Sequence, residues 1–267
     1  MTATRLRTAS GGGILDGAAA LVTGAGSGLG DASARALADA GARLVVTELP
    51  DRMAGAEATA DALRTGHGAE ATALPLDVTD LGSIRACAEA AAGAFGGRID
   101  ILVNNAGLNI PQMALDVTEE AWDKVLDVNL KGLFFMSQAV GRRMHDQSPQ
   151  GGCIVNIASQ NGLIGYYKRA AYCSSKAGVV NLTRVLALEW APFNIRVNAV
   201  CPTFVETPLT QQTLADPDTR ADILRRIPLG RLATMEEIAA AVVYLASPGA
   251  AMVTGHPLVI DGGWTAV

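Results

Sequence analysis

Tyr172 and Lys176 are two side chains whose types and spacing suit proton transfer. Residues 171–190 follow a helical pattern, so side chains four positions apart lie on one face of the helix. A free tyrosine has a pKa of about 10 and is a poor base at neutral pH. A lysine ammonium nearby favours the phenolate and lowers that pKa. The pair therefore predicts a proton acceptor matched to the working pH.

A glycine-rich turn, Gly24-x-x-x-Gly28-x-Gly30, separates a strand-like segment from a helical one. The G-x-G-x-x-G spacing does not fit, because Leu29 occupies the place of its third glycine. Such a turn lets the backbone approach a pyrophosphate, whose charge the helix N-terminus favours. We expect these residues and Ser27 to contact a dinucleotide. A loop without a ligand is the alternative.

Glu48 ends the second strand-like segment, 20 residues after Gly28. An acidic side chain there binds the adenosine ribose hydroxyls and repels a 2′-phosphate. The residue before Gly28 is Ser27, which is not basic. We therefore expect NAD rather than NADP, with Glu48 and Leu49 among its contacts. Asp51 is the competing ribose ligand, and a solvated carboxylate is the alternative for both acids.

Asp77 and Val78 close the third strand-like segment and are further expected cofactor contacts. The Asp77 carboxylate could accept a hydrogen bond from the adenine amino group. An N-cap for the following helix is an equally good alternative for Asp77, although Thr79 or Asp80 could also serve as the cap.

Apolar strand-like segments alternate with helical ones along the chain. The strand-like segments are 18–23, 44–47, 71–76, 101–104, 153–158, 196–200 and 258–260. The helical segments are 28–40, 52–64, 81–95, 119–144, 171–190 and 235–245. Nearly continuous apolar strands between helices indicate a parallel sheet covered on both faces. Right-handed crossovers then give a doubly wound α/β sheet.

Composition narrows the class further. The 267 residues are 49% hydrophobic and 4% aromatic, with a net charge of −5, which suits one α/β domain and makes nucleic acid a poor partner. No apolar stretch is long enough to span a membrane. The four cysteines and three histidines form no metal-binding spacing, so we expect no metal site and no disulfide framework. A cytoplasmic enzyme acting on a small molecule is the expectation.

Two segments depart from the α/β alternation. Residues 1–13 contain two arginines and no apolar segment, so we expect a flexible tail rather than a signal peptide, with the domain over 14–267. Residues 206–228 are polar and bounded by proline. Because loops after strand ends build the site in such sheets, we expect a substrate lid there. An ordinary surface excursion is the alternative.

The segment Asn104-Asn105-Ala106-Gly107 follows the fourth strand-like segment. Together with the glycine turn, Ser159 and the Tyr172–Lys176 pair, it resembles the short-chain dehydrogenase/reductase family. The likeness runs from about residue 15 to the C-terminus. It implies a single Rossmann-type domain with a seven-stranded parallel sheet. It also implies metal-free interconversion of alcohols and ketones with NAD(P).

The resemblance implies a catalytic tetrad of Asn129, Ser159, Tyr172 and Lys176. In it, Ser159 hydrogen-bonds the developing carbonyl or alkoxide, and Lys176 also holds the nicotinamide ribose. Asn129 positions a water that relays protons. The alternative for Asn129 is a polar residue that satisfies a helix bulge.

Further cofactor contacts follow from the same resemblance. They are Asn105, Ala106, Gly107, Pro202, Val205 and Thr207. Thr203 departs from the family pattern, which usually has glycine after this proline, and the departure affects the backbone beside the nicotinamide.

Substrate contacts are expected beside the reacting groups. They are Asn109, Gln160, Asn161, Tyr167 and Thr203. Adjacent amides suit hydroxyl-rich ligands, which favours a polyol, sugar or hydroxy acid. The basic pair Lys168 and Arg169 could bind an anionic group, and a solvated loop is the alternative.

Other functions stay open at this point. One alternative is a 3-oxoacyl-thioester (acyl-carrier-protein) reductase, and another is a non-catalytic nucleotide-binding protein. Gly262 and Gly263 resemble a family segment at a tetramer interface, so we expect a homotetramer, with a dimer as the alternative.

Overall fold

Short runs of aliphatic and β-branched residues form one parallel sheet in the computed structural model, which describes residues 13–266. The strands are β1 (Ala19–Val22), β2 (Arg43–Glu48), β3 (Ala71–Pro75), β4 (Ile101–Asn104), β5 (Gly152–Ile157), β6 (Ile195–Pro202) and β7 (Pro257–Ile260). Within the described part they lie in the order β3-β2-β1-β4-β5-β6-β7. The order reverses between β1 and β4, as in a doubly wound sheet. The predicted fold class is confirmed.

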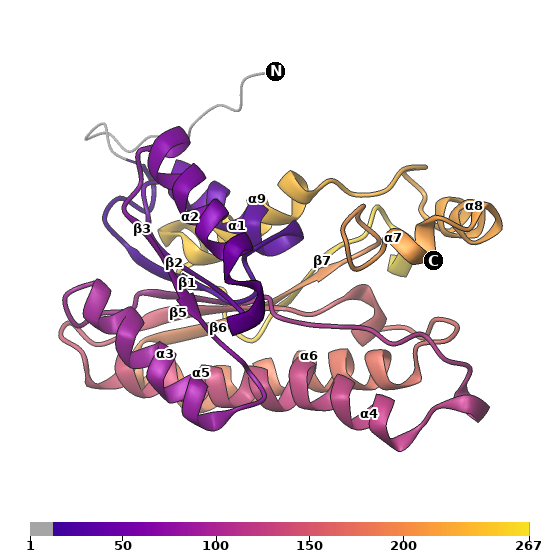
Figure 1. The fold of residues 1–267 in the computed structure, drawn as a ribbon, viewed down its shortest axis with the longest axis horizontal. Helices are drawn as coiled ribbons and strands as arrows, with labels where there is room; N and C mark the ends of the chain where they lie inside the picture. The colour runs from indigo at the N-terminus through magenta and orange to yellow at the C-terminus, as the bar shows by residue number, and fades with distance from the viewer. Residues whose placement is uncertain (1–12, 267) are drawn as a thin grey trace.

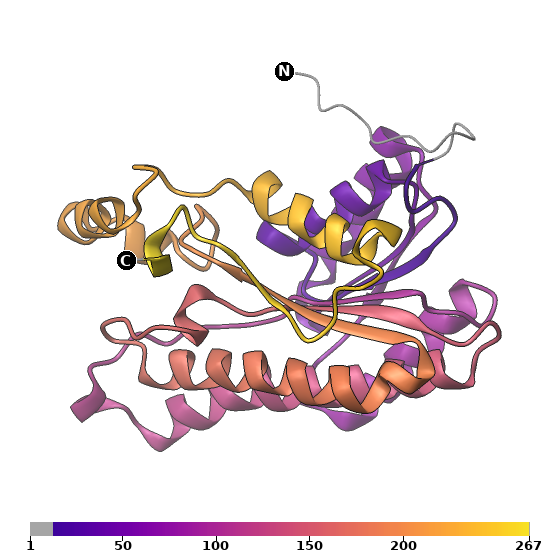
Figure 2. The ribbon, with the colours of Figure 1, turned by 180° about the vertical axis from the view of Figure 1, so that it is seen from behind.

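Helices cover both faces of the sheet (Figure 1). They are α1 (Gly28–Asp39), α2 (Met53–His67), α3 (Leu81–Ala94), α4 (Glu119–Leu126), α5 (Leu133–Asp146), α6 (Ala170–Trp190), α7 (Gln211–Leu214), α8 (Pro217–Arg226) and α9 (Met235–Ala246). Helices α1, α2 and α9 pack on one face, and α3, α5 and α6 pack on the other (Figures 1 and 2).

Alternation along the strands divides the core between these two helical layers. In β1, Ala20 and Val22 join the cluster under α1, α2 and α9, whereas Leu21 joins the cluster under α3, α5 and α6. Successive side chains of a strand point to opposite faces, so a strand buried on both sides must be apolar throughout. This is the physical reason that the strand-like segments of the sequence lack polar alternation.

The long helical segment expected over 119–144 is not one regular helix. Helix α4 is followed by a π-helical turn at Asp127–Gly132, and α5 then continues to Asp146. Gly132 lies so close to the segment between β3 and α3 that a Cβ atom there would be 2.5 Å from the Val78 carbonyl oxygen. The wider turn places the Asn129 side chain in a fully buried position.

The expected lid segment contains α7 and α8, which extend beyond the sheet beside the C-terminal residues (Figures 1 and 2). A separate apolar cluster holds it. This cluster comprises Phe204, Leu214, Ile223, Ile227 and Trp264. Trp264, which is distant in the sequence, therefore packs against this segment.

The N-terminal expectation falls largely outside the described residues, because it concerns residues 1–12. Gly13 itself packs beside Ala40, where a Cβ atom would lie 2.0 Å from the carbonyl oxygen. Among residues 13–266, no helix is both long and apolar enough to cross a bilayer.

The close approach at Gly132 can be tested by adding one methyl group. Gly132→Ala should lower the free energy of unfolding by about 1–3 kcal/mol, because the new Cβ atom meets backbone that cannot move aside. Gly93→Ala in α3 is the matched control, since no heavy atom lies within 4 Å of its Cβ position. It should stabilise by about 0.5–1 kcal/mol. Urea denaturation measures both, and equal effects would contradict the packing described.

Candidate active site

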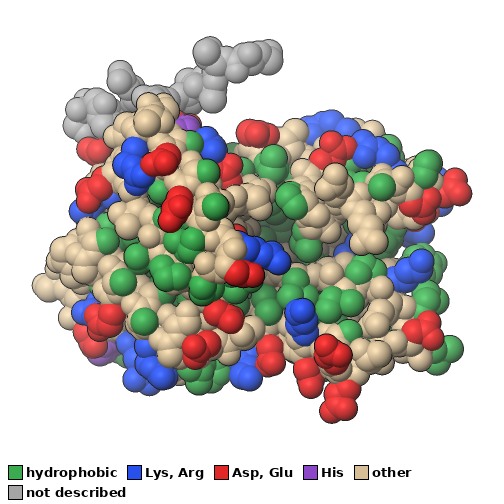
Figure 3. Space-filling view, in the orientation of Figure 1, with side chains coloured by type: hydrophobic (Ala, Val, Ile, Leu, Met, Phe, Trp, Pro, Cys, Tyr) green, Lys and Arg blue, Asp and Glu red, His purple; other side chains and the backbone are tan. Residues whose placement is uncertain are grey.

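A cleft of about 1030 Å³ opens where the carboxyl ends of the central strands meet. It begins at the point between β1 and β4 where the strand order reverses, which is where open α/β sheets bind ligands. Its other side is lined by Thr207, Pro208 and Leu209, which belong to the segment after β6. In the space-filling view a hollow is visible near the centre of the face, with acidic and basic side chains interspersed around it (Figure 3).

The glycine turn forms one wall of this cleft. Gly24 and Gly28 have φ angles of 61° and 57°, a left-handed conformation that other residues rarely adopt. Ser27 occupies the N-cap position of α1, and its exposed side chain makes no capping hydrogen bond. The N-terminus of α1 therefore presents backbone N–H groups and a hydroxyl to the cleft, an arrangement that suits a pyrophosphate.

Hydrogen bonds between the ends of β1 and β4 fix that turn. The Thr23 hydroxyl accepts from the backbone N–H groups of Asn105 and Ala106, at 3.0 Å each. The Asn105 amide donates to the carbonyl oxygens of Thr23 and Gly24, at 3.0 and 2.8 Å. Gly30 packs behind the turn, where a Cβ atom would lie 2.2 Å from the Gly24 carbonyl oxygen. The Asn105 side chain and Gly30 thus shape the turn.

The far end of the cleft carries the acidic residue expected for ribose recognition. Glu48 lies at the end of β2, and its Oε1 accepts from the Leu49 N–H at 3.0 Å. Arg52 lines the same end, although its place in the sequence gave no sign of this. Asp77 also lines the cleft and accepts from the Thr79 N–H and hydroxyl, whereas Asp80 caps α3. The structure therefore places the α3 N-cap on Asp80, which leaves Asp77 at the cleft.

Tyr172, Ser159 and Lys176 meet at the inner end of the cleft. Burial raises the pKa of Tyr172, while the charge of Arg169 and a hydrogen bond with Ser159 act in the opposite direction. The Lys176 ammonium lies 5.8 Å from the centroid of the Tyr172 ring and donates to the Ile157 carbonyl oxygen at 2.7 Å. Burial lowers the pKa of Lys176 to about 8. A phenol, a hydroxyl and a cation therefore converge on one point.

Asn129 lies behind this group, outside the cleft lining. Its Oδ1 accepts from the Leu108 N–H at 2.8 Å, and its Nδ2 donates to the Leu108 carbonyl at 2.9 Å and the Ser175 hydroxyl at 3.1 Å. A Cβ atom at Gly107 would lie 3.3 Å from Asn129 Oδ1 and 3.7 Å from Lys176 Nζ. Asn129 thus connects the π-helical turn, the loop after β4 and α6 beside the lysine.

The expected substrate residues differ in how deeply their side chains are buried. Asn109, Gln160, Asn161 and Thr203 each have a buried polar side-chain atom without a hydrogen-bond partner among the described residues. Gln160 is only 1% exposed, and both of its amide atoms are unpartnered. Tyr167, in contrast, is 70% exposed. Buried polar atoms in native proteins are nearly always paired, so unpaired ones near a site suggest ligand contacts.

Most of the sequence-predicted residues line the cleft. These are Gly24, Ser27, Gly28, Leu29, Glu48, Leu49, Asp77, Val78, Asn105, Ala106, Gly107, Ser159, Tyr172, Lys176, Pro202, Thr203, Val205 and Thr207. The residues outside its lining are Gly30, Asn109, Asn129, Gln160, Asn161 and Tyr167. Within residues 13–266, no group of three or more His, Cys, Asp or Glu side chains could hold a metal ion.

Sequence reasoning missed Arg52, and it named Arg169 only as a candidate for binding an anionic group. Arg52 reaches the adenosine end, and Arg169 is buried among aromatic rings beside Tyr172. No spacing rule marks either residue, because both positions depend on how separate segments pack. The cleft-lining residues Glu120, Asp123 and Lys124 of α4 were missed for the same reason.

Comparison with known proteins identifies the family. A family model described as enoyl-(acyl carrier protein) reductase matches residues 24–265. D-threitol dehydrogenase of Mycolicibacterium smegmatis is 48% identical over 252 residues, which cover 94% of each chain. NAD-dependent glycerol dehydrogenase of Listeria innocua is 41% identical over 246 residues, covering 92% of this chain and 93% of the relative.

A solved structure agrees in fold as well as sequence. A proposed NAD(P)-dependent gluconate 5-dehydrogenase from Beutenbergia cavernae, with bound NADP, superposes with a TM-score of 0.89 at 41% identity. The match covers 95% of this chain and 98% of that one. The chain therefore belongs to the short-chain dehydrogenase/reductase family of oxidoreductases, which act on alcohol groups. The family prediction is confirmed.

Proposed function

We propose that this chain is an NAD-dependent dehydrogenase that interconverts a secondary alcohol and a ketone of a polyol, sugar or hydroxy acid. The observation that carries the proposal is the convergence of Tyr172, Ser159 and Lys176 at the inner end of the cleft. The glycine turn and Glu48 occupy the remainder of that cleft and fit the phosphates and ribose of a dinucleotide. When bound, the dinucleotide supplies the hydride acceptor.

The proton leaves the substrate hydroxyl for the phenolic oxygen of Tyr172. The Ser159 hydroxyl, which accepts from the Asn161 N–H at 3.1 Å, remains able to donate to the developing carbonyl or alkoxide oxygen. Lys176 contributes positive charge beside the phenol and a donor for the ribose hydroxyls. We assign Asn129 a positioning role, because it holds the Leu108 backbone and the Ser175 hydroxyl beside Lys176. In this arrangement a water molecule could relay protons from the lysine.

The substrate class is supported by an unpartnered polar side chain of the cleft. The Thr203 hydroxyl lines the cleft without a hydrogen-bond partner and suits a hydroxyl-rich ligand, whereas the unpartnered amides of Asn109, Gln160 and Asn161 lie outside the lining. The related D-threitol and glycerol dehydrogenases act, by their names, on such compounds. A 3-oxoacyl-thioester reductase is the competing substrate class. A protein that binds the dinucleotide without turnover is the competing function.

Tyr172→Phe tests the catalytic assignment. The variant should lose at least about 100-fold in kcat for alcohol oxidation, because general-base catalysis contributes roughly 10²–10⁴-fold. NAD⁺ affinity, measured by calorimetry, should stay within about twofold. The substrate screen follows NADH formation over polyols, sugars, hydroxy acids and simple secondary alcohols, with 3-oxoacyl thioesters tested in reduction. Turnover of the thioesters alone would exclude the proposed substrate class, and tight NADH binding without any turnover would exclude catalysis.

Cofactor preference is assigned to Glu48, since its carboxylate would repel a 2′-phosphate. Glu48→Ser should reduce the ratio of kcat/KM for NAD⁺ over NADP⁺ by at least about tenfold, because one charged interaction of about 1.4 kcal/mol corresponds to that factor. Arg52 at the same end then remains to attract the phosphate. Glu57→Ser, exposed on α2, is the control and should leave the ratio unchanged. A wild-type preference for NADP⁺ would contradict the assignment.

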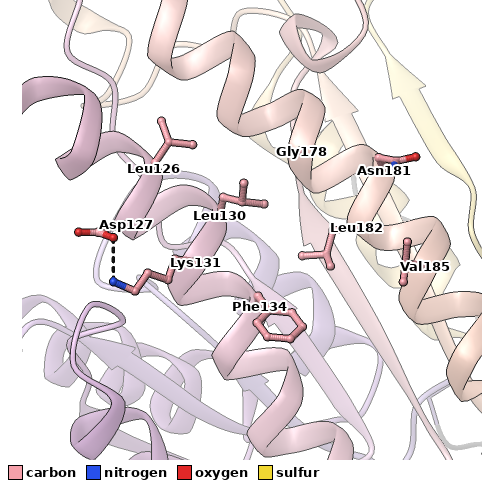
Figure 4. A pocket seen from close by; sticks show the side chains of 9 residues that line it. All are labelled: Leu126, Asp127, Leu130, Lys131, Phe134, Gly178, Asn181, Leu182 and Val185. Carbon is pink, nitrogen blue, oxygen red and sulfur yellow. Dashed lines mark hydrogen bonds and ion pairs between the residues drawn. The ribbon is translucent and has the colours of Figure 1, made fainter. Parts of the chain in front are cut away.

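Assembly into a homotetramer is part of the proposal. An apolar groove runs between the α4–α5 segment and α6 (Figure 4), and is lined by Leu126, Leu130, Phe134, Gly178, Leu182 and Val185. Farther along α6, Leu188 is also exposed. Exposed apolar side chains on α6 beside half-buried ones on the α4–α5 segment suit a two-fold interface with a second copy of the chain.

Val185→Glu should dissociate this interface, because each copy would bury an unpaired carboxylate. Light scattering coupled to size-exclusion chromatography should show a species of half the wild-type mass or less. Met252→Glu is the control, since Met252 is 96% exposed and lies outside the groove, whereas Val185 is 40% exposed. A wild-type mass equal to one chain would contradict the proposed assembly.

A further inference from the structure

Arg169 is a buried cation that the catalytic assignment leaves without a role. The residue is 7% exposed and precedes the first turn of α6, three positions before Tyr172. Its Nη2 donates to the Thr213 hydroxyl at 3.2 Å. Among residues 13–266, no carboxylate lies within ion-pair distance of the guanidinium, although buried arginines usually have such a partner.

Aromatic rings surround the Arg169 guanidinium in place of an anion. Its central carbon lies 5.3 Å from the ring centroid of Phe204, 5.6 Å from that of Tyr172 and 6.0 Å from that of Tyr166. These are cation–π distances. Among the three rings, only Tyr172 belongs to the catalytic group. The Arg169 guanidinium therefore lies in cation–π contact with the proposed base.

Within residues 13–266, the groups that act on Tyr172 include two cations and no carboxylate. Cys173 and Lys176 lie on α6 and Arg169 directly precedes it, while the Ser159 hydroxyl and the Cys201 thiol come from outside that helix. Burial raises the pKa of Cys201 to about 11, so this thiol is neutral at working pH. Of the two cations, Arg169 is the one whose charge opposes the effect of burial on the pKa of Tyr172, while the Lys176 ammonium lies 5.8 Å from the ring centroid.

The two cations differ in how firmly they hold their charge. Burial lowers the pKa of Lys176 to about 8, so this side chain begins to lose its proton in mildly alkaline solution. A guanidinium stays protonated throughout the working range, even though burial lowers the pKa of Arg169. Arg169 thus supplies the positive charge that persists when the lysine is neutral.

We infer that Arg169 is a positioning residue for proton transfer, whose permanent charge holds Tyr172 ready to accept the substrate proton. This inference rests on the proposed dehydrogenase function. Burial alone would keep the phenol protonated, and Arg169 is the foremost of the groups that oppose it. The effect passes through Tyr172, and Arg169 itself touches no reacting atom in this assignment.

The test is the pH profile of kcat for alcohol oxidation with saturating NAD⁺. Activity should rise with pH as Tyr172 loses its proton. In Arg169→Met the apparent pKa of this rise should move up by about one unit, since removing an opposite charge at this range shifts a pKa by roughly that much. The rate near neutral pH should then fall about tenfold while the alkaline plateau is retained. Arg169→Lys should restore most of the shift, because it keeps a cation.

Arg226→Met is the matched control. Arg226 also lies over aromatic rings, 6.0 Å from the Tyr166 centroid and 5.9 Å from the Trp264 centroid, but it pairs with Asp222 at 2.7 Å. Its removal should perturb the lid and leave the apparent pKa unchanged. Should Arg169→Met fail to fold, Arg169→Gln keeps a donor for Thr213 and is expected to show the same pKa shift.

A second measurement needs no substrate. Ultraviolet difference titration of tyrosinate, compared with Tyr172→Phe, should report the same upward shift for Tyr172 in Arg169→Met. An unchanged apparent pKa in both measurements would overturn the inference, as would a higher KM for hydroxy acids alone, which would make Arg169 an anion-binding residue. Absence of alcohol oxidation in the wild type would instead refute the proposed function, while the tyrosinate titration would still decide the role of Arg169.

Discussion

Hydrogen bonds at the carboxyl ends of β1 and β4 hold the two halves of the cleft in register. The Thr23 hydroxyl accepts from two successive backbone N–H groups, and the Asn105 side-chain amide donates to two carbonyl oxygens at the glycine turn. The chain leaves β1 and β4 toward opposite helical layers, so backbone polar groups at this reversal have no strand partner. Side chains must satisfy them, because an unpaired buried group costs about 1–3 kcal/mol. The same bonds keep the turn open for a phosphate.

The site beyond this reversal depends on burial of charge. Lys176 and Arg169 are both buried, and neither pairs with a carboxylate among the described residues. Carbonyl oxygens, hydroxyls and aromatic faces partly replace the lost water. Such an arrangement costs folding stability, and proteins retain it where a shifted pKa is useful. The π-helical turn at Asp127–Gly132 belongs to the same arrangement, since it places Asn129 against the loop that borders Lys176.

An aromatic cluster connects the cleft to Trp264 near the C-terminus. Phe204 directly follows Thr203 at the cleft, and its ring stacks on Trp264, with centroids 5.9 Å apart. Tyr166 contacts both rings from the loop before α6. Arg169 donates to Thr213 of α7, and its guanidinium lies against the rings of Tyr166 and Phe204 as well as that of Tyr172, so this packing borders the surroundings of Tyr172 directly.

Local patterns in the sequence determined the fold class and most of the cofactor side of the cleft. Apolar strands, the glycine turn and Glu48 act through chain segments a few residues long, and parallel strands must bring their carboxyl ends to one edge. The spacing of Tyr172 and Lys176 likewise fixed their shared helix face.

Tertiary structure alone decided the features that depend on contacts between distant segments. Gly132 at the end of the π-helical turn packs against Val78, and Arg52 reaches the cleft because α2 packs beside the glycine turn. Arg169 could equally have been a solvated loop residue by its sequence. Its burial results from Phe204 and Thr213, which are 35 and 44 positions away along the chain. The electrostatic potential at Tyr172 cannot be read from any short stretch of sequence, because it depends on several side chains that only folding brings together.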